Sequence, residues 1–154
     1  MIQQSSTTNG SISRRGFLKH SAAAATVAGT ASLALSRSAH AAGGGAIKIG
    51  MIGCGGRCSG AAAQALKAGP DVKLVAMCDV FDSRLQASRK NLKTQFGEQV
   101  DVSDDHCFVG LDGYKGVIDS VDVVHIACAS KFHPMYSEAA IQAGKHVFVE
   151  KPHA

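Results

Sequence analysis

The sequence predicts an α/β protein built on a doubly wound parallel sheet. Apolar, β-branched runs alternate with helical segments through short turns, so strand and helix follow each other repeatedly along the chain. The run at residues 121–128 is nearly continuous, as expected for a strand that helices cover on both faces. A second observation is that the first apolar run leads through a glycine-rich turn directly into a helix of small residues.

Residues 1–41 are predicted to lie outside this fold. Residues 13–19 place two arginines before an apolar pair and a lysine, and an alanine-rich run follows at residues 21–35. That run is too short and too weakly apolar for a membrane span of about 20 residues, so no stable membrane anchor is expected. Ala39 and Ala41 fit a signal peptidase site. The segment resembles a twin-arginine (Tat) signal peptide cleaved after Ala41, which implies the Tat translocase as a partner and a periplasmic location.

Charge and cysteine content exclude several classes of function for residues 42–154. Four of the 16 basic residues and none of the 12 acidic residues precede Ala42, so the rest of the chain carries no net charge. It shows no basic stripe interleaved with aromatics, and a nucleic-acid partner is not expected. The five cysteines are odd in number and contain no Cys-x-x-Cys pair, so neither a disulfide framework nor a metal site is predicted.

The first strand is expected to begin near Ile47 and to enter the glycine-rich turn, with a helix over residues 59–66 after it. Gly53 would allow a sharp turn, and Gly55 would let the backbone approach a pyrophosphate. The free N–H groups and the dipole of the helix would then attract the phosphates. The predicted contacts are Gly53, Cys54, Gly55, Gly56 and Arg57. The alternative is a glycine-rich loop that binds nothing.

Cys58 takes the third small position of this turn. One interpretation is a small residue that packs the helix against the strand. The other is a redox-sensing thiol, because a helix N-terminus lowers the pKa of a cysteine.

Asp79 ends the second predicted strand, at residues 72–78, about 20 residues after the turn. A carboxylate at this spacing accepts the hydroxyls of an adenosine ribose and repels a 2′-phosphate, so NAD is favoured over NADP. Asp79 could instead cap the next helix, predicted from Asp82 to Phe96. The cations of that helix are interpreted as a solvated face: Arg84, Arg89, Lys90 and Lys93.

Residues 99–103 are predicted as a short third strand, and residues 104–118 as a turn or helix weakened by three glycines. His125 lies within the next strand, over residues 121–128, and is expected to be packed in the sheet, since a lone imidazole is not a ligand set. His133 has a better functional claim, because its turn follows the carboxyl end of that strand, where open α/β sheets bind ligands.

A helix over residues 135–143 and a strand over residues 145–149 complete the pattern. That last strand brings Glu150, Lys151 and Pro152 to the same edge of the sheet as the glycine turn.

Four stretches together resemble one known family: residues 53–57, residues 78–80, the turn from Ala127 to His133, and residues 144–152. The chain is similar to the N-terminal Rossmann domain of the glucose-fructose oxidoreductase, inositol dehydrogenase and MocA-like (Gfo/Idh/MocA) family. The resemblance covers almost all of residues 42–154, and the Glu-Lys-Pro triplet is its most specific part. The family turn usually reads Thr-Pro-Asn, where this chain has Cys128-Ala129-Ser130.

The resemblance implies roles for several residues. Lys151 would be catalytic, lying beside the nicotinamide and holding or relaying the proton of the substrate hydroxyl during hydride transfer. Pro152 would follow a cis peptide bond. Further cofactor contacts would come from Ala127, Cys128, His133, Glu150 and Lys151 itself.

As a whole, the resemblance implies the nucleotide-binding part of an exported NAD-dependent oxidoreductase that acts on a sugar, a polyol or a related hydroxy compound. Family members continue into a substrate domain, so the chain is expected to be incomplete and the full-length form a possible homo-oligomer. One alternative is a redox-neutral, NAD-dependent glycosidase. Another is a non-catalytic nucleotide-binding module.

Overall fold

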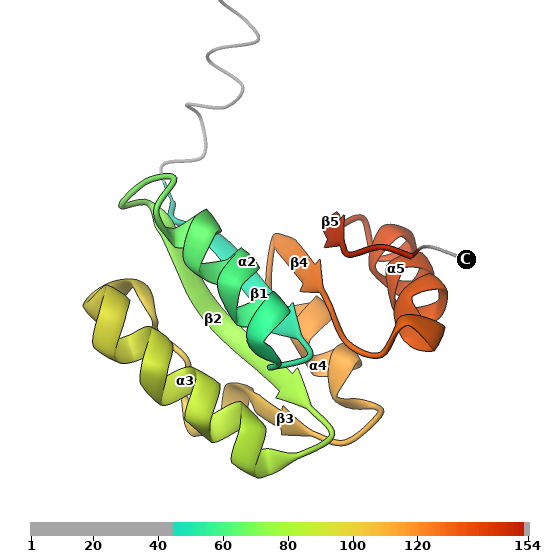
Figure 1. Ribbon diagram of the computed structural model, residues 1–154. Coiled ribbons are helices and arrows are strands. Elements are labelled where there is room, and N and C mark those ends of the chain that lie inside the picture. The colour runs from blue at the N-terminus through green and yellow to red at the C-terminus, as the bar shows by residue number, and fades with distance from the viewer. Residues whose placement is uncertain (1–44, 153–154) are drawn as a thin grey trace, which may run out of the picture. The chain divides into compact units, whose positions relative to one another are not determined.

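A computed structural model describes residues 45–152 and is shown in Figure 1. The predicted Tat signal at residues 1–41 lies outside the described residues. The strands are β1 (Ile47–Ile52), β2 (Val72–Asp79), β3 (Cys107–Val109), β4 (Val123–Ile126) and β5 (His146–Val149). They form one parallel sheet in the order β3-β2-β1-β4-β5. This is the strand order of a doubly wound sheet, so the predicted fold class is confirmed.

Helices cover both faces of the sheet (Figure 1). Helices α2 (Gly56–Leu66) and α3 (Asp82–Phe96) pack on one face, and α4 (Gly113–Ser120) and α5 (His133–Gln142) pack on the other. Because successive strand residues point to opposite faces, Met51 of β1 joins the first cluster and Ile52 the second. The two apolar clusters hold the strands so that their carboxyl ends meet at one edge.

Glycines allow α4 to pack closely on the sheet. A Cβ on Gly50 of β1 would lie 2.6 Å from a methyl group of Val117, and a Cβ on Gly116 would lie 2.4 Å from the ring of Phe108. Gly116 weakens the helical pattern of α4, but it makes room for the ring of Phe108, which packs against the helix.

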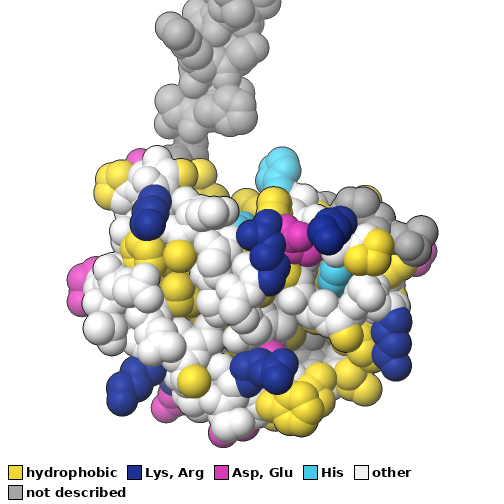
Figure 2. All heavy atoms as spheres, in the orientation of Figure 1, with side chains coloured by type: hydrophobic (Ala, Val, Ile, Leu, Met, Phe, Trp, Pro, Cys, Tyr) yellow, Lys and Arg dark blue, Asp and Glu magenta, His cyan; other side chains and the backbone are white. Residues whose placement is uncertain are grey.

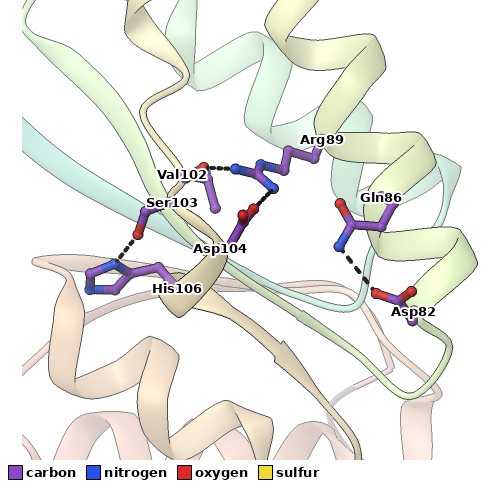
Figure 3. A network of polar contacts seen from close by, with 7 residues as sticks. All are labelled: Asp82, Gln86, Arg89, Val102, Ser103, Asp104 and His106. Atoms are coloured by element: carbon purple, nitrogen blue, oxygen red, sulfur yellow. Dashed lines mark hydrogen bonds and ion pairs between the residues drawn. The ribbon is translucent and has the colours of Figure 1, made fainter.

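The prediction of a third strand at residues 99–103 is wrong. Val100 forms an isolated bridge with Leu74, and β3 begins at Cys107. Side chains of α3 bind the backbone of the intervening segment: Arg89 donates to the carbonyl of Val102, as Figure 3 shows, and Lys93 Nζ donates to the carbonyl of Val100 over 2.9 Å. These carbonyls are satisfied by side chains of α3 instead of by a neighbouring strand.

Two short helices flank this segment, at Gly97–Gln99 and Asp104–His106. Arg89 also pairs with Asp104 over 2.6 Å (Figure 3), so the interpretation of the α3 cations as a wholly solvated face is wrong for Arg89.

The prediction of a turn or helix over residues 104–118 is wrong in part, because β3 (Cys107–Val109) lies within this segment and α4 begins only at Gly113. The remaining predicted elements are present, most of them with shifted ends. Helix α3 has the predicted bounds, whereas α2 begins at Gly56 and α5 at His133, earlier than predicted. Strand β4 is shorter than the apolar run that predicted it. Within residues 45–152, no helix is both long and apolar enough to cross a membrane.

Candidate functional site

Backbone hydrogen bonds bring the predicted site segments together at the carboxyl edge of the sheet. The N–H of Gly53 donates to the carbonyl of Cys78 over 2.9 Å, and the N–H of Ala127 donates to that of Ile52 over 3.2 Å. On the other side of β4, the N–H of Glu150 donates to Ile126 over 2.9 Å. Strands β1, β4 and β5 are neighbours in the sheet. The segments that follow them, which are the glycine turn, the turn after β4 and the Glu-Lys-Pro segment, therefore lie side by side at the carboxyl edge.

The glycine turn leaves open space in front of α2. Gly53 has φ +92°, and a Cβ there would lie 2.9 Å from the Cα of Cys128, so only glycine fits without strain. A Cβ on Gly55 or Gly56 would meet nothing within 4 Å. No side chain of residues 45–152 caps the N-terminus of α2, and its first turn contains no acid. The N–H groups and the positive dipole end remain available to an anion.

Asp79 ties this turn to the start of α3. The residue is 8% exposed; Oδ2 accepts the N–H of Cys54 over 2.7 Å, and Oδ1 accepts the N–H of Phe81 over 2.9 Å. Phe81 is the residue at the N-terminal cap of α3. Each carboxylate oxygen has a further lone pair, so Asp79 retains acceptor capacity toward the cleft that it lines.

A cleft of about 390 Å³ lies along this edge, beside the ends of β1, β2 and β4. Five predicted site residues line it: Gly53, Gly55, Asp79, Ala127 and Cys128. Six predicted site residues are not among those that line it: Cys54, Gly56, Arg57, His133, Glu150 and Lys151. Of these six, Cys54 is bonded through its N–H to Asp79, whereas Arg57 and His133 contact the segment that carries Glu150 and Lys151.

Sequence analysis missed the aromatic and basic lining of the cleft. Phe81 is 58% exposed, and the guanidinium of Arg84 lies 5.3 Å from the centre of its ring. Tyr136 stacks on Phe132 with ring centres 5.5 Å apart, and its hydroxyl donates to the carbonyl of Leu111 over 3.1 Å. The position of Phe81 two residues after Asp79 was a signal for a lining residue. The i, i+4 spacing of Phe132 and Tyr136 indicates a shared helix face but not the cleft.

Two side chains bind the segment that carries Lys151. Arg57 pairs with Glu150, and this hydrogen bond lowers the pKa of the Glu150 carboxyl. His133 is 2% exposed, with Nδ1 3.0 Å from the carbonyl oxygen of Pro152 and Nε2 3.1 Å from that of Cys128. Figure 2 shows an acidic side chain flanked by basic ones on the face that α2 and the end of β5 share. Lys151 is exposed, and its peptide bond to Pro152 is cis, as the resemblance implies.

Three thiols near the turn are buried and protonated. Burial raises the pKa of Cys58 and of Cys78 to about 12 and raises that of Cys54 as well. Cys58 is fully buried, with Sγ 3.6 Å from the carbonyl oxygen of His125. The interpretation of Cys58 as a packing residue is confirmed. The redox-sensing alternative is wrong, because burial outweighs the effect of the helix dipole on this thiol.

His125 is packed in the sheet as predicted. Its ring lies 5.4 Å from that of Phe148, and its Nδ1 has no hydrogen-bond partner among residues 45–152. Burial lowers the pKa of this imidazole.

Comparisons with known proteins agree with this geometry. Residues 47–154 match the model of the Gfo/Idh/MocA group, described as an oxidoreductase family with an NAD-binding Rossmann fold. A glycosyl hydrolase family 109 protein from Solibacter usitatus is 33% identical over 114 residues, which cover 71% of this chain and 25% of that protein.

Two solved structures are similar to the fold. The WlbA dehydrogenase from Bordetella pertussis, in complex with NADH and UDP-GlcNAcA, has a TM-score of 0.52 and 26% identity, covering 71% of this chain and 30% of that one. A 3-ketoreductase from Actinomadura kijaniata, in complex with NADP, has a TM-score of 0.50 and 27% identity, covering 71% and 31%. The chain therefore spans between 25% and 31% of the length of these three relatives.

Proposed function

Because this chain belongs to the Gfo/Idh/MocA oxidoreductase family, through its NAD-binding Rossmann domain, we propose that the cleft at the ends of β1, β2 and β4 holds a nicotinamide dinucleotide. The observation that carries the proposal is the open space before α2. A Cβ on Gly55 would meet nothing within 4 Å, beside N–H groups that no side chain of residues 45–152 caps. Such a helix N-terminus fits a pyrophosphate. The turn contacts would come from Gly53, Cys54, Gly55, Gly56 and Arg57.

We propose NAD as the preferred form of the cofactor. The Asp79 carboxylate lines the cleft, where it would accept ribose hydroxyls and repel a 2′-phosphate. The solved relatives contain NADH in one case and NADP in the other, so the family accommodates both. Arg84 lines the same cleft, and a cation there favours NADP. The balance between Asp79 and Arg84 would therefore decide the preference.

We further propose that the protein containing this domain oxidises or reduces a sugar, a polyol or a related hydroxy compound. The bound nicotinamide would supply the hydride acceptor or donor. In the oxidation, Lys151 as the neutral amine would take the hydroxyl proton while hydride passes to the nicotinamide, and in the reverse reaction its ammonium form would return that proton. The dehydrogenase and the ketoreductase support this class of reaction. Cofactor contacts from Ala127, Cys128, His133 and Glu150, Tat export, a periplasmic location and a homo-oligomeric full-length form stay predictions from the sequence.

A redox-neutral glycosidase is the second candidate, favoured by the 33% identity to a glycosyl hydrolase family 109 protein. The two reactions differ in whether NADH accumulates. An oxidoreductase converts NAD to NADH in proportion to the sugar product, whereas a redox-neutral glycosidase releases sugar with no net NADH. NADH absorbance and sugar release, recorded together with a protein containing this domain, would separate them.

The cofactor proposal is tested by titration calorimetry of the 154-residue chain with NAD and with NADP. We expect NAD to bind in the micromolar range and at least about tenfold more tightly than NADP. Asp79→Asn should narrow that ratio, and Arg84→Gln should widen it. Lys90→Gln, which removes an α3 cation outside the cleft, is the matched control and should leave both constants unchanged. Dissociation constants weaker than millimolar for both cofactors would contradict the proposal.

A further inference from the structure

Two side chains from distant parts of the chain fix the residues on either side of Lys151. Arg57, in the first turn of α2, pairs with Glu150, which precedes the lysine. His133, the first residue of α5, lies with Nδ1 3.0 Å from the carbonyl oxygen of Pro152, which follows it. Lys151 therefore lies in the chain between two residues that these contacts hold.

The lysine itself has no comparable contact. Across the part of the chain that the structure describes, no hydrogen bond or ion pair of the Lys151 side chain is present. The residue also lies past the end of β5, and the last backbone bond before it is that from the N–H of Glu150 to Ile126. The position of Lys151 thus depends on how firmly Glu150 and Pro152 are held.

His133 links this segment to the cleft. Its Nε2 lies 3.1 Å from the carbonyl oxygen of Cys128, and Cys128 lines the cleft next to Gly53. Arg57 makes a second link, because it belongs to the glycine turn where α2 begins. Both links run from the proposed cofactor-binding elements to the residues that flank Lys151.

We infer that Arg57 and His133 are positioning residues that hold Lys151 in place beside the glycine turn. This role needs no direct contact between either side chain and a cofactor. Its meaning for catalysis rests on the proposed function, because Lys151 is the proposed catalytic group. The positioning itself is a property of the cofactor-free chain and is tested without cofactor.

The two contacts should respond differently to substitution. The Arg57 side chain is 55% exposed and Glu150 17%, and exposed ion pairs contribute little to global stability. Arg57→Gln should therefore loosen the segment without unfolding the protein. His133 is 2% exposed, and each ring nitrogen lies near a backbone carbonyl oxygen, to one of which a neutral imidazole donates its N–H. Its replacement therefore carries a greater risk to the fold.

The test is ¹⁵N relaxation of the cofactor-free 154-residue chain, read at the Lys151 amide. A rigid backbone gives an order parameter of about 0.85, and a flexible one falls below about 0.6. We expect the wild-type amide to be rigid and to become flexible in Arg57→Gln and in His133→Phe. Arg57→Lys, and the charge swap of Arg57→Glu with Glu150→Arg, should restore rigidity. Lys115→Gln removes another exposed ion pair, with Asp112, and should change nothing at Lys151.

An unchanged order parameter at Lys151 in folded Arg57→Gln and His133→Phe would overturn the inference. If His133→Phe does not fold, the Arg57→Gln variant and the charge swap decide the outcome. Failure of the proposed function would be seen separately: the wild-type chain would not bind NAD, although its Lys151 amide would still be rigid.

Discussion

The two halves of the candidate site are held in place by different means. The cleft half is built from backbone: Gly53 lies against the Cα of Cys128, and buried Asp79 accepts two backbone N–H groups. The lysine half lies past the last strand and is held by side chains, the Arg57–Glu150 pair and the ring of His133. The cleft half is thus fixed by the fold itself, whereas the lysine half depends on contacts that single substitutions can remove.

This difference suits the two proposed tasks. A pyrophosphate bound to backbone N–H groups requires a turn of fixed shape, because those donors cannot move independently. A lysine that exchanges a proton with a substrate requires a position near the turn, and its flexible side chain can adjust the rest.

The largest effect is expected from Gly53→Ala. Alanine is strained at φ +92°, and its Cβ would lie 2.9 Å from the Cα of Cys128. We expect the affinity for NAD to fall by a factor of at least about one hundred, or roughly 2.7 kcal/mol. Titration calorimetry measures the loss. Gly60→Ala in α2 is the control, because a Cβ there meets nothing within 4 Å and Gly60 does not line the cleft. The same loss in both variants would show that the turn geometry is not the cause.

A smaller effect is expected at His133 of the lysine half, which can be compared with His125, a buried histidine of β4. His133→Phe removes the contacts to two carbonyls and should lower the free energy of unfolding by about 1–3 kcal/mol. His125→Phe replaces a ring whose Nδ1 has no partner among residues 45–152, so it should be nearly neutral. Urea unfolding of the two variants measures both values. Equal losses of unfolding free energy in the two variants would mean that the contacts of His133 do not contribute to stability.

The two histidine variants should also differ in acid. Burial lowers the pKa of His125 below 6.5, so the unfolded chain takes up a proton there more readily than the folded chain does. The stability that the neutral His125 contributes is therefore fully present above about pH 6.5 and is lost as the pH falls below this value. His125→Phe should weaken this dependence. The measurement is the free energy of unfolding of both proteins between neutral and mildly acidic pH. The same slope in the wild type and in His125→Phe would argue against a neutral buried His125.

The smallest effect concerns the reactivity of the five cysteine thiols. Cys54, Cys58 and Cys78 are at most 4% exposed and have raised pKa values, so they should resist alkylation in the folded chain. Cys107 and Cys128 are partly exposed and should react. NAD should protect Cys128, which lines the cleft, but not Cys107, which serves as the internal control. Mass spectrometry of the labelled peptides measures the protection, and equal labelling of Cys128 with and without NAD would contradict it.

Local sequence patterns were sufficient for the backbone of the cleft half, but not for its aromatic and basic lining. The apolar runs gave β1, β2 and β4, the glycine spacing gave the turn, and Asp79 lies at the end of β2 as expected. Each of these features depends on neighbours within a few residues. Even so, the pattern did not show that Asp79 accepts the N–H of Cys54, because that bond joins residues on two different strands.

Features set by tertiary contacts could not be read from the sequence. Val100 and Val102 alternate as in a strand, but Arg89 and Lys93 bind the carbonyls of this segment, and β3 forms later in the chain. Likewise, Arg84 belongs by its pattern to a solvated face, yet it lines the cleft because the start of α3 lies beside it. Glu150 lies 93 residues from Arg57 along the chain, and Pro152 lies 19 residues from His133.

The most direct test of the account is an NAD titration of the ¹⁵N-labelled chain, followed in amide spectra. The account predicts saturable shifts at the amides of Gly53, Gly55, Asp79 and Cys128, all of which line the cleft. The amides of Lys93 and Lys115, which do not line it, should stay in place. Shifts confined to other parts of the chain, or none at millimolar NAD, would contradict the claim that this cleft binds the cofactor.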